Sequence, residues 1–198
     1  MEQKPQKAAL SIHFDPQKLI GNQYYVKIYY AGEEPKDRGE MLDNLSLHLN
    51  HVVNALAAMM NTAIRDFGIE KGRLYNELIN YLTKMRDANG FIEFEPPVIN
   101  NRKKMVIDPV ELQILYDPYK PREAQYEMVH ETYLEKPKTK ADVLQVLVTD
   151  ICHLTNGLIY LLDMVVKDYS QNRKEVYNQT THQLLLIRGF GLELTKNV

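Results

Sequence analysis

Apolar residues recur at alternating spacings of three and four positions between residues 39 and 67, which is typical of one continuous helical seam. Its members are Leu42, Leu45, Leu49, Val52, Leu56, Met59 and Ala63. A second seam in the later half of the chain consists of Leu144, Leu147, Ile151, Leu154, Leu158, Leu161 and Val165. A helix of about 28 residues is about 42 Å long, more than one small unit can cover. The pattern therefore predicts a pair of long helices packed along a heptad-like seam.

Two strands are predicted before the first long helix. Residues 8–14 alternate between apolar and polar, and the Asp15-Pro16 pair that follows them favours a turn. Residues 23–30, QYYVKIYY, are aromatic and β-branched, so they are expected to form the second strand of a hairpin.

A shorter helix and a closing strand are predicted after it. Residues 70–87 place apolar side chains on one face, and Gly90 supplies a stop signal. Residues 91–95, FIEFE, read as a short strand, with residues 191–195 as a shortened counterpart. The expected order of elements in one unit is ββααβ.

The chain repeats itself at an offset of 102 residues without a gap. About twenty identities fall between positions 10 and 86, where chance would give roughly five. They include Asp15, Pro16, Gln23, Tyr24, His51, Asn54, Tyr75, Asn76 and Arg86, which match Asp117, Pro118, Gln125, Tyr126, His153, Asn156, Tyr177, Asn178 and Arg188. The repeat indicates a tandem duplication, as in a fused dimer.

These patterns predict an α+β fold with pseudo-two-fold symmetry. We expect one repeat unit over residues 1–96, a connector over residues 97–106 and a second unit over residues 107–198, with both units in one compact body. Only two copies are present, which argues against a solenoid because stacked repeats usually need three or more.

Composition describes an ordinary globular protein. The formal net charge is −2, and the only basic cluster is Arg102, Lys103 and Lys104 in the predicted connector. A single cysteine, Cys152, excludes a disulfide within the chain and fits a reducing compartment. Residues 1–7 are polar, unlike a signal peptide, and residues 143–166 are interrupted by charged side chains. We therefore expect a cytoplasmic protein with no membrane anchor.

A stripe of polar residues, most of them uncharged, runs along both long helices. Its members are His51, Asn54 and Asn61 in the first copy, and His153, Asn156 and Asp163 in the second. A solvent-facing helix surface usually carries Glu and Lys, so this stripe indicates a buried hydrogen-bond network, a ligand site or a partner surface. Tyr75 and Tyr177 lie early in the shorter helices and are further candidate binding residues.

No P-loop, dinucleotide-binding turn, CxxC, HExxH or GxSxG motif is present, so the sequence predicts no catalytic residue, no cofactor and no metal site. His48 and His51 have the i, i+3 spacing of paired metal ligands, but no third or fourth ligand accompanies them. The leading hypothesis is a non-enzymatic binding or assembly protein that acts through a pseudo-dimeric scaffold and binds a protein partner or itself.

Three alternatives stay open at this point. Tyr-rich strands could stack the bases of single-stranded nucleic acid; the tyrosines concerned are Tyr24, Tyr25, Tyr29, Tyr30, Tyr116, Tyr119, Tyr126 and Tyr133. A metal-assisted hydrolase could use the His/Asn stripe. A small-molecule ligand could also lie between the two copies.

Overall fold

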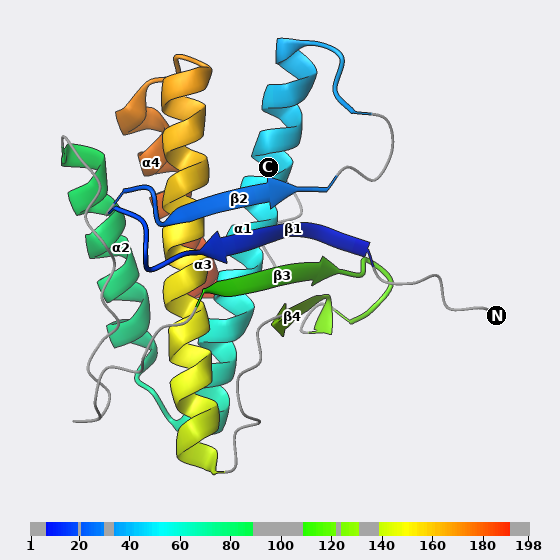
Figure 1. The fold of residues 1–198 in the computed structure, drawn as a ribbon. Helices are drawn as coiled ribbons and strands as arrows, with labels where there is room; N and C mark the ends of the chain where they lie inside the picture. Colours follow the sequence, from blue (N-terminus) through cyan, green and yellow to red (C-terminus); the bar gives the residue numbers. More distant parts are fainter. Residues whose placement is uncertain are drawn as a thin grey trace.

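The structure, a computed structural model, describes residues 7–19, 21–29, 34–88, 109–121, 124–130 and 139–190. Its elements are β1 (Lys7–Phe14), β2 (Tyr24–Ile28), α1 (Arg38–Phe67), α2 (Lys71–Asp87), β3 (Val110–Tyr116), β4 (Tyr126–His130), α3 (Lys140–Asp168) and α4 (Arg173–Phe190). In this part of the chain the fold is mixed α+β, with a four-stranded antiparallel sheet and four helices (Figure 1). The predicted strands at 91–95 and 191–195 and the connector at 97–106 lie outside the described residues.

The two long helices begin at matching caps, 102 positions apart. The Asp37 carboxylate accepts a hydrogen bond from the backbone N–H of Glu40, and the Thr139 hydroxyl accepts one from that of Asp142. Such caps satisfy backbone donors that have no partner within the helix. At the other end of α1, Gly68 adopts φ 68°, a left-handed conformation that a side chain would strain. The predicted long helix over residues 39–67 is confirmed to within one residue.

The long helices α1 and α3 run antiparallel and pack along each other (Figure 1). The start of each helix meets the end of the other through a cation and an aromatic ring. The Arg38 guanidinium lies 5.7 Å from the centre of the Tyr169 ring, and the Lys140 ammonium lies 5.4 Å from the centre of the Phe67 ring. Both ends of the pair are therefore held by equivalent contacts.

The sheet has the strand order β2-β1-β3-β4, so the strands of the two hairpins meet at its centre. In the first hairpin Leu10 pairs with Ile28, and in the second Leu112 pairs with His130. These registers are the same once 102 is subtracted from each number of the second pair. The predicted hairpin between residues 8–14 and 23–30 is thus confirmed.

The same backbone hydrogen bonds close the two hairpin turns. The N–H of Asp15 donates to the carbonyl of Gln23, and the N–H of Asp117 donates to that of Gln125, each at 2.9 Å. Each aspartate also accepts at its carboxylate from a backbone N–H two residues further on, at 3.0 Å. The carboxylate bonds explain why the repeat keeps Asp at the turns. The glutamines are explained by their side-chain amides, which donate to the carbonyls of Pro16 and Pro118.

Each hairpin packs on the long helix of the other half of the chain. Strand β2 contacts α3 and strand β4 contacts α1, while α2 packs mainly against α4 (Figure 1). Leu10, Ile12, Leu112 and Ile114 are almost fully buried between the sheet and the helices. The two halves therefore share one hydrophobic core.

Helix α3 is long and apolar enough to cross a membrane by composition alone, but most of its apolar window is buried against other elements. Asp150, His153 and Asn156 also lie on its buried surface. Burial of this kind is that of a core helix, so the structure is consistent with a soluble protein.

Candidate functional site

The polar stripe predicted on the long helices is buried or half-buried, and His51, Asn54, His153 and Asn156 in it hydrogen-bond to tyrosines from the opposite half. One group of four residues, the Tyr24 cluster, comprises Tyr24, Tyr81, His153 and Asn156. The Tyr81 hydroxyl donates to Oδ1 of Asn156 at 3.4 Å, and Nδ2 of Asn156 donates to the Tyr24 hydroxyl at 3.2 Å. The Tyr24 proton is then directed at Nδ1 of His153, 3.0 Å away. The cluster is a directed chain that joins β2, α2 and α3.

An equivalent group, the Tyr126 cluster, comprises Tyr126, His51 and Asn54. Nδ1 of His51 lies 3.1 Å from the Tyr126 hydroxyl, and Nδ2 of Asn54 donates to that hydroxyl at 3.5 Å. Position 183, which corresponds to Tyr81, is a glutamine whose amide donates to Oδ1 of Asn50 instead. Oδ1 of Asn54 is buried without a hydrogen-bond partner among the described residues. The hydrogen-bond chain of the Tyr126 cluster therefore has one residue fewer than that of the Tyr24 cluster.

Burial sets the protonation of the Tyr126 cluster and its neighbour His48. Desolvation, followed by the nearby His51, lowers the pKa of His48 to about 4. Desolvation also lowers the pKa of His51 and raises that of Tyr126 to about 12. A general base works best with a pKa near the operating pH. Burial instead lowers the pKa values of His48 and His51 further below neutral pH and raises that of Tyr126 further above it. Their geometry and protonation fit hydrogen bonding between neutral groups.

The remaining stripe residues, Asn61 and Asp163, bind the tyrosines of the shorter helices. The Tyr177 hydroxyl donates to Oδ1 of Asp163 at 2.8 Å, and the Tyr75 hydroxyl donates to Oδ1 of Asn61 at 3.4 Å. Desolvation raises the pKa of Tyr75 to about 12, and desolvation together with the Asp163 carboxylate raises that of Tyr177. Both tyrosines therefore stay protonated and act as donors.

Arg173 extends the Asp163 site and was not singled out from sequence. Its guanidinium donates to Oδ1 of Asp163 at 2.9 Å and to the carbonyl oxygen of Met85 at 2.7 Å. Because Met85 lies in the last turn of α2, this arginine joins the start of α4 to the end of α2 and to α3. Nothing in the local sequence signals such a contact over 88 positions.

A reciprocal pair of hydrogen bonds joins α2 and α4. Arg86 donates to Oδ1 of Asn178 at 2.7 Å, and Arg188 donates to Oδ1 of Asn76. The repeat retains all four residue types, but the sequence alone did not show that each arginine binds the asparagine of the other half. Because these bonds connect the two halves, they give a structural reason why the repeat keeps arginine and asparagine at these four positions.

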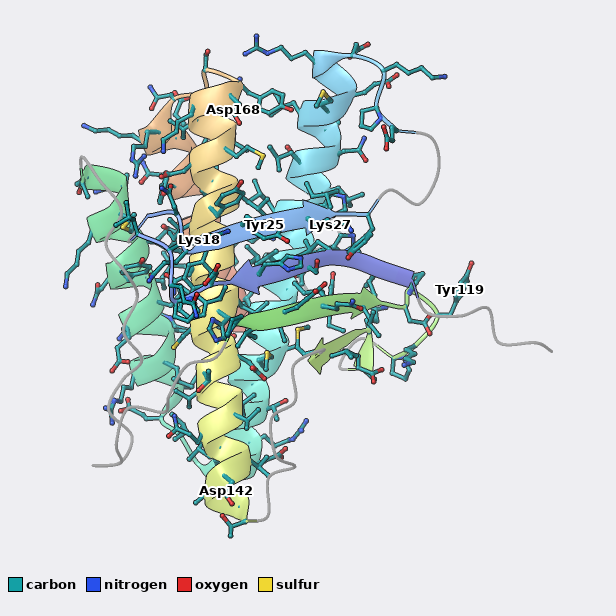
Figure 2. All side chains as sticks on the ribbon, in the orientation of Figure 1. Lys18, Tyr25, Lys27, Tyr119, Asp142 and Asp168 are labelled. Atoms are coloured by element: carbon teal, nitrogen blue, oxygen red, sulfur yellow. The ribbon has the colours of Figure 1, made fainter. Side chains whose placement is uncertain are left out.

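The outer face of the sheet, which points away from the helices, brings Tyr25 and Tyr29 of the predicted tyrosine platform together with His13, which the sequence did not single out. Tyr25 is 44% exposed there and stacks on His13, with ring centres 4.2 Å apart and planes within 3°. The Lys27 ammonium lies 5.1 Å from the centre of the Tyr29 ring. Figure 2 shows Tyr25 and Lys27 lying across this open face, with Tyr119 at one end of the sheet. Strand alternation could have indicated this surface once the core-facing positions were assigned.

The predicted tyrosine platform is divided between the two faces. Tyr24, Tyr116 and Tyr126 are on the helix side; Tyr25 and Tyr29 are on the outer side, and Tyr119 projects from a turn. Tyr30 and Tyr133 lie outside the described residues. Base stacking requires an accessible ring face. On the outer side one face of Tyr25 is occupied by His13, and the Lys18 ammonium lies 5.8 Å from the ring centre.

Among the residues that the structure describes, no group of three or more His, Cys, Asp or Glu side chains is placed to hold a metal ion. His48 and His51, the candidate ligand pair, have ring centres 5.9 Å apart and are both buried. Cys152 is buried and takes part in no disulfide.

Comparison with known proteins gives no relative. The chain matches no protein-family model, and searches of curated proteins and of solved structures found no match.

Proposed function

We propose that this protein is a non-enzymatic binding or assembly protein in which a duplicated unit forms one pseudo-symmetric scaffold that presents its outer sheet face to a partner protein. The observation that carries the proposal is the use of the polar stripe. His51, Asn54, His153 and Asn156 hydrogen-bond to tyrosines of the opposite half, which favours a role in joining the halves. The sheet face is then the aromatic and charged surface left for binding.

The pairing of the strands supports a duplication with pseudo-two-fold symmetry. In the central pair Leu10 lies opposite Ile114, Ile12 opposite Leu112, and Ser11 opposite Gln113. Each pair exchanges into the other when 102 is added to one number and subtracted from the other. An axis between Ser11 and Gln113 would relate residues 1–96 to 107–198, as in an isologous dimer.

Reciprocal contacts support a fused dimer in particular. The Tyr24 and Tyr126 clusters, the Arg86 and Arg188 bonds, and the two cation-ring contacts all cross from one half to the other. In an ancestral single unit, each of these contacts would have joined two chains. A linker that joins the copies would keep the interface while making the subunits inseparable, and we place the protein in the cytoplasm.

The experiment compares two surface variants of equal exposure. Tyr25→Ser changes the outer sheet face, and Met41→Ser changes the first turn of α1; both side chains are 44% exposed. Native mass spectrometry and affinity capture from the source cells should find a bound protein that Tyr25→Ser loses and Met41→Ser retains. A wild-type protein that stays monomeric and recovers no partner contradicts the proposal. So does a complex that Tyr25→Ser leaves intact.

A further inference from the structure

The outer sheet face has opposite character on its two halves. Over β1 and β2 it carries Lys27, Tyr25 and His13, whereas over β3 and β4 it carries Glu111 and Glu127. The equivalents of Tyr25 and Lys27 at the offset of 102 are Glu127 and Val129. One end of the face is therefore aromatic and basic, and the other is acidic and aliphatic.

We infer that this face binds the same face of a second copy of the chain, with β2 of each copy above β4 of the other. The inference rests on the proposed function, because it names the partner that the scaffold would bind. A two-fold axis parallel to the strands, above the line between β1 and β3, brings the basic half of each copy onto the acidic half of the other. The surface is thus complementary to itself, as an isologous interface requires.

The row in which each side chain lies specifies the contact. Lys27 pairs across the sheet with Ser11, which pairs with Gln113 and then Val129, so in the dimer Lys27 enters above Val129 of the second copy. The Lys27 ammonium already leans over Tyr29, toward the row that contains Glu127. It therefore meets the Glu127 carboxylate of the second copy.

Glu127 can accept this second ammonium. In its own copy, Oε2 of Glu127 lies 3.6 Å from the Lys120 ammonium, and 53% of the Glu127 side chain is exposed. A carboxylate has two oxygens that accept several hydrogen bonds, so both lysines can bind it. Lys27 is exposed, so its ammonium is free to reach a second copy, whereas its neighbours Val26 and Ile28 face the core.

A nucleic-acid partner has less support from the same surface. Phosphate binding requires basic side chains along the path of the strand, and Glu111 and Glu127 lie on half of this face. The Tyr25 ring is already stacked on His13. A protein surface with the opposite charge order matches both halves.

The size of the face predicts a weak dimer. Four strands spaced about 4.8 Å apart, each with about six residues that rise about 3.3 Å, give a face of about 19 Å by 20 Å. Two such faces have an area of about 760 Å² in total, which is below the size of standard specific interfaces. We therefore expect dissociation in the micromolar range, in the class of transient complexes.

The experiment uses sedimentation equilibrium of the full chain from about 1 μM to about 500 μM, a range that brackets a micromolar dissociation constant. Lys27→Glu and Glu127→Lys are measured separately, combined in one chain, and as an equimolar mixture of the two single variants. Glu77→Lys, at a half-buried position of α2 outside the sheet face, is the charge-reversal control. Circular dichroism establishes that each variant folds.

Each single reversal places like charges together twice in the symmetric dimer, so it should weaken association at least about tenfold, while the double variant and the mixture recover wild-type affinity. Equal dissociation constants for all variants would overturn the assigned face. A wild-type chain that stays monomeric would overturn self-association. In that case the proposed function survives if Tyr25→Ser still abolishes capture of another protein, and fails if nothing is captured.

Discussion

The Tyr24 and Tyr126 clusters occupy equivalent positions in the two halves, yet only one of them is a complete chain. In the Tyr24 cluster, Tyr81 donates to Asn156 and thereby orients its amide. In the Tyr126 cluster, Gln183 turns to Asn50, and Oδ1 of Asn54 stays without a described partner. The difference between Tyr81 and Gln183 therefore determines whether the amide oxygen of the neighbouring asparagine accepts a hydrogen bond within the described part of the chain.

The same lesson applies to the layer of the shorter helices. Tyr177 donates at 2.8 Å to a carboxylate that also binds Arg173, whereas the equivalent Tyr75 donates to the amide oxygen of Asn61 at 3.4 Å. Matched backbone positions therefore carry unequal stabilisation. The C-terminal half should be the more sensitive to loss of these polar contacts.

The largest effect is expected for Asp163→Ala. The substitution removes two charge-assisted hydrogen bonds and leaves the partly buried Arg173 without its carboxylate, at a cost of about 3 kcal/mol. Asn61→Ala removes one long hydrogen bond and should cost about 1 kcal/mol. Urea denaturation of both variants measures the free energies of unfolding, and a loss at Asn61 as large as that at Asp163 would contradict the asymmetry.

The next effect is the pH dependence that His48 confers on the first half. Its pKa is about 4 when folded and 6.5 in the unfolded reference, so the unfolded chain binds the proton more readily as pH falls through this window. Stability is full above the unfolded value and should fall by about 2 kcal/mol between about pH 7 and about pH 5.

His48→Gln is the test of that pH dependence, because glutamine does not titrate. Its unfolding free energy should vary less with pH than that of the wild type, and His182→Gln, at an exposed position on α4, should retain the wild-type profile. An unchanged slope in His48→Gln would assign the acid sensitivity to other groups.

Removal of the tyrosine hydroxyl from the Tyr24 cluster and from the Tyr126 cluster compares the two hydrogen-bond chains directly. Tyr24→Phe removes the hydrogen bonds to both His153 and Asn156 and should cost about 2 kcal/mol, while Tyr126→Phe, whose contact to Asn54 is longer, should cost about 1 kcal/mol. Thermal and urea denaturation would report the difference. Equal losses would mean that Tyr81 does not strengthen the first cluster.

The smallest effect concerns a position where the two halves differ by one methyl group. Gly157 corresponds to Ala55, so the repeat alone predicts that alanine is tolerated at 157. In the structure a Cβ at 157 would lie 2.8 Å from Cγ1 of Ile12 and closer still to its Cδ1. The clash outweighs the gain in helix propensity, and Gly157→Ala should cost about 1 kcal/mol.

Gly189→Ala is the matched control because nothing lies within 4 Å of a Cβ at that position of α4. It should leave stability unchanged or raise it by about 0.5 kcal/mol through helix propensity. A gain in stability at both glycines would show that Ile12 moves aside without cost.

The sequence predicted local structure well because its signals are local. Alternation over residues 8–14, the three-four spacing over 39–67 and the Asp15-Pro16 turn each specify an element from neighbouring residues. The pairing of long helices followed from their length, since a rod of that size needs a partner surface.

Contacts between the halves could not be predicted in the same way. Periodicity gives the buried side of a strand but does not say which helix covers it. The sequence therefore carried no signal that Tyr24 of β2 packs against α3. Arg173 was missed because its partners Asp163 and Met85 lie on different elements. The stripe was found because polar residues interrupt an apolar helix, but the identity of its tyrosine partners depends on the fold.

The central pairing of β1 with β3 also constrains how the chain folds. Its hydrogen-bonded partners, such as Ile12 and Leu112, are about 100 residues apart, so loop-closure entropy must be overcome before the ladder forms. Helices can form early from local contacts, but the sheet must wait until both halves have been synthesised. Refolding should therefore show helical signal first and burial of the tyrosines afterwards.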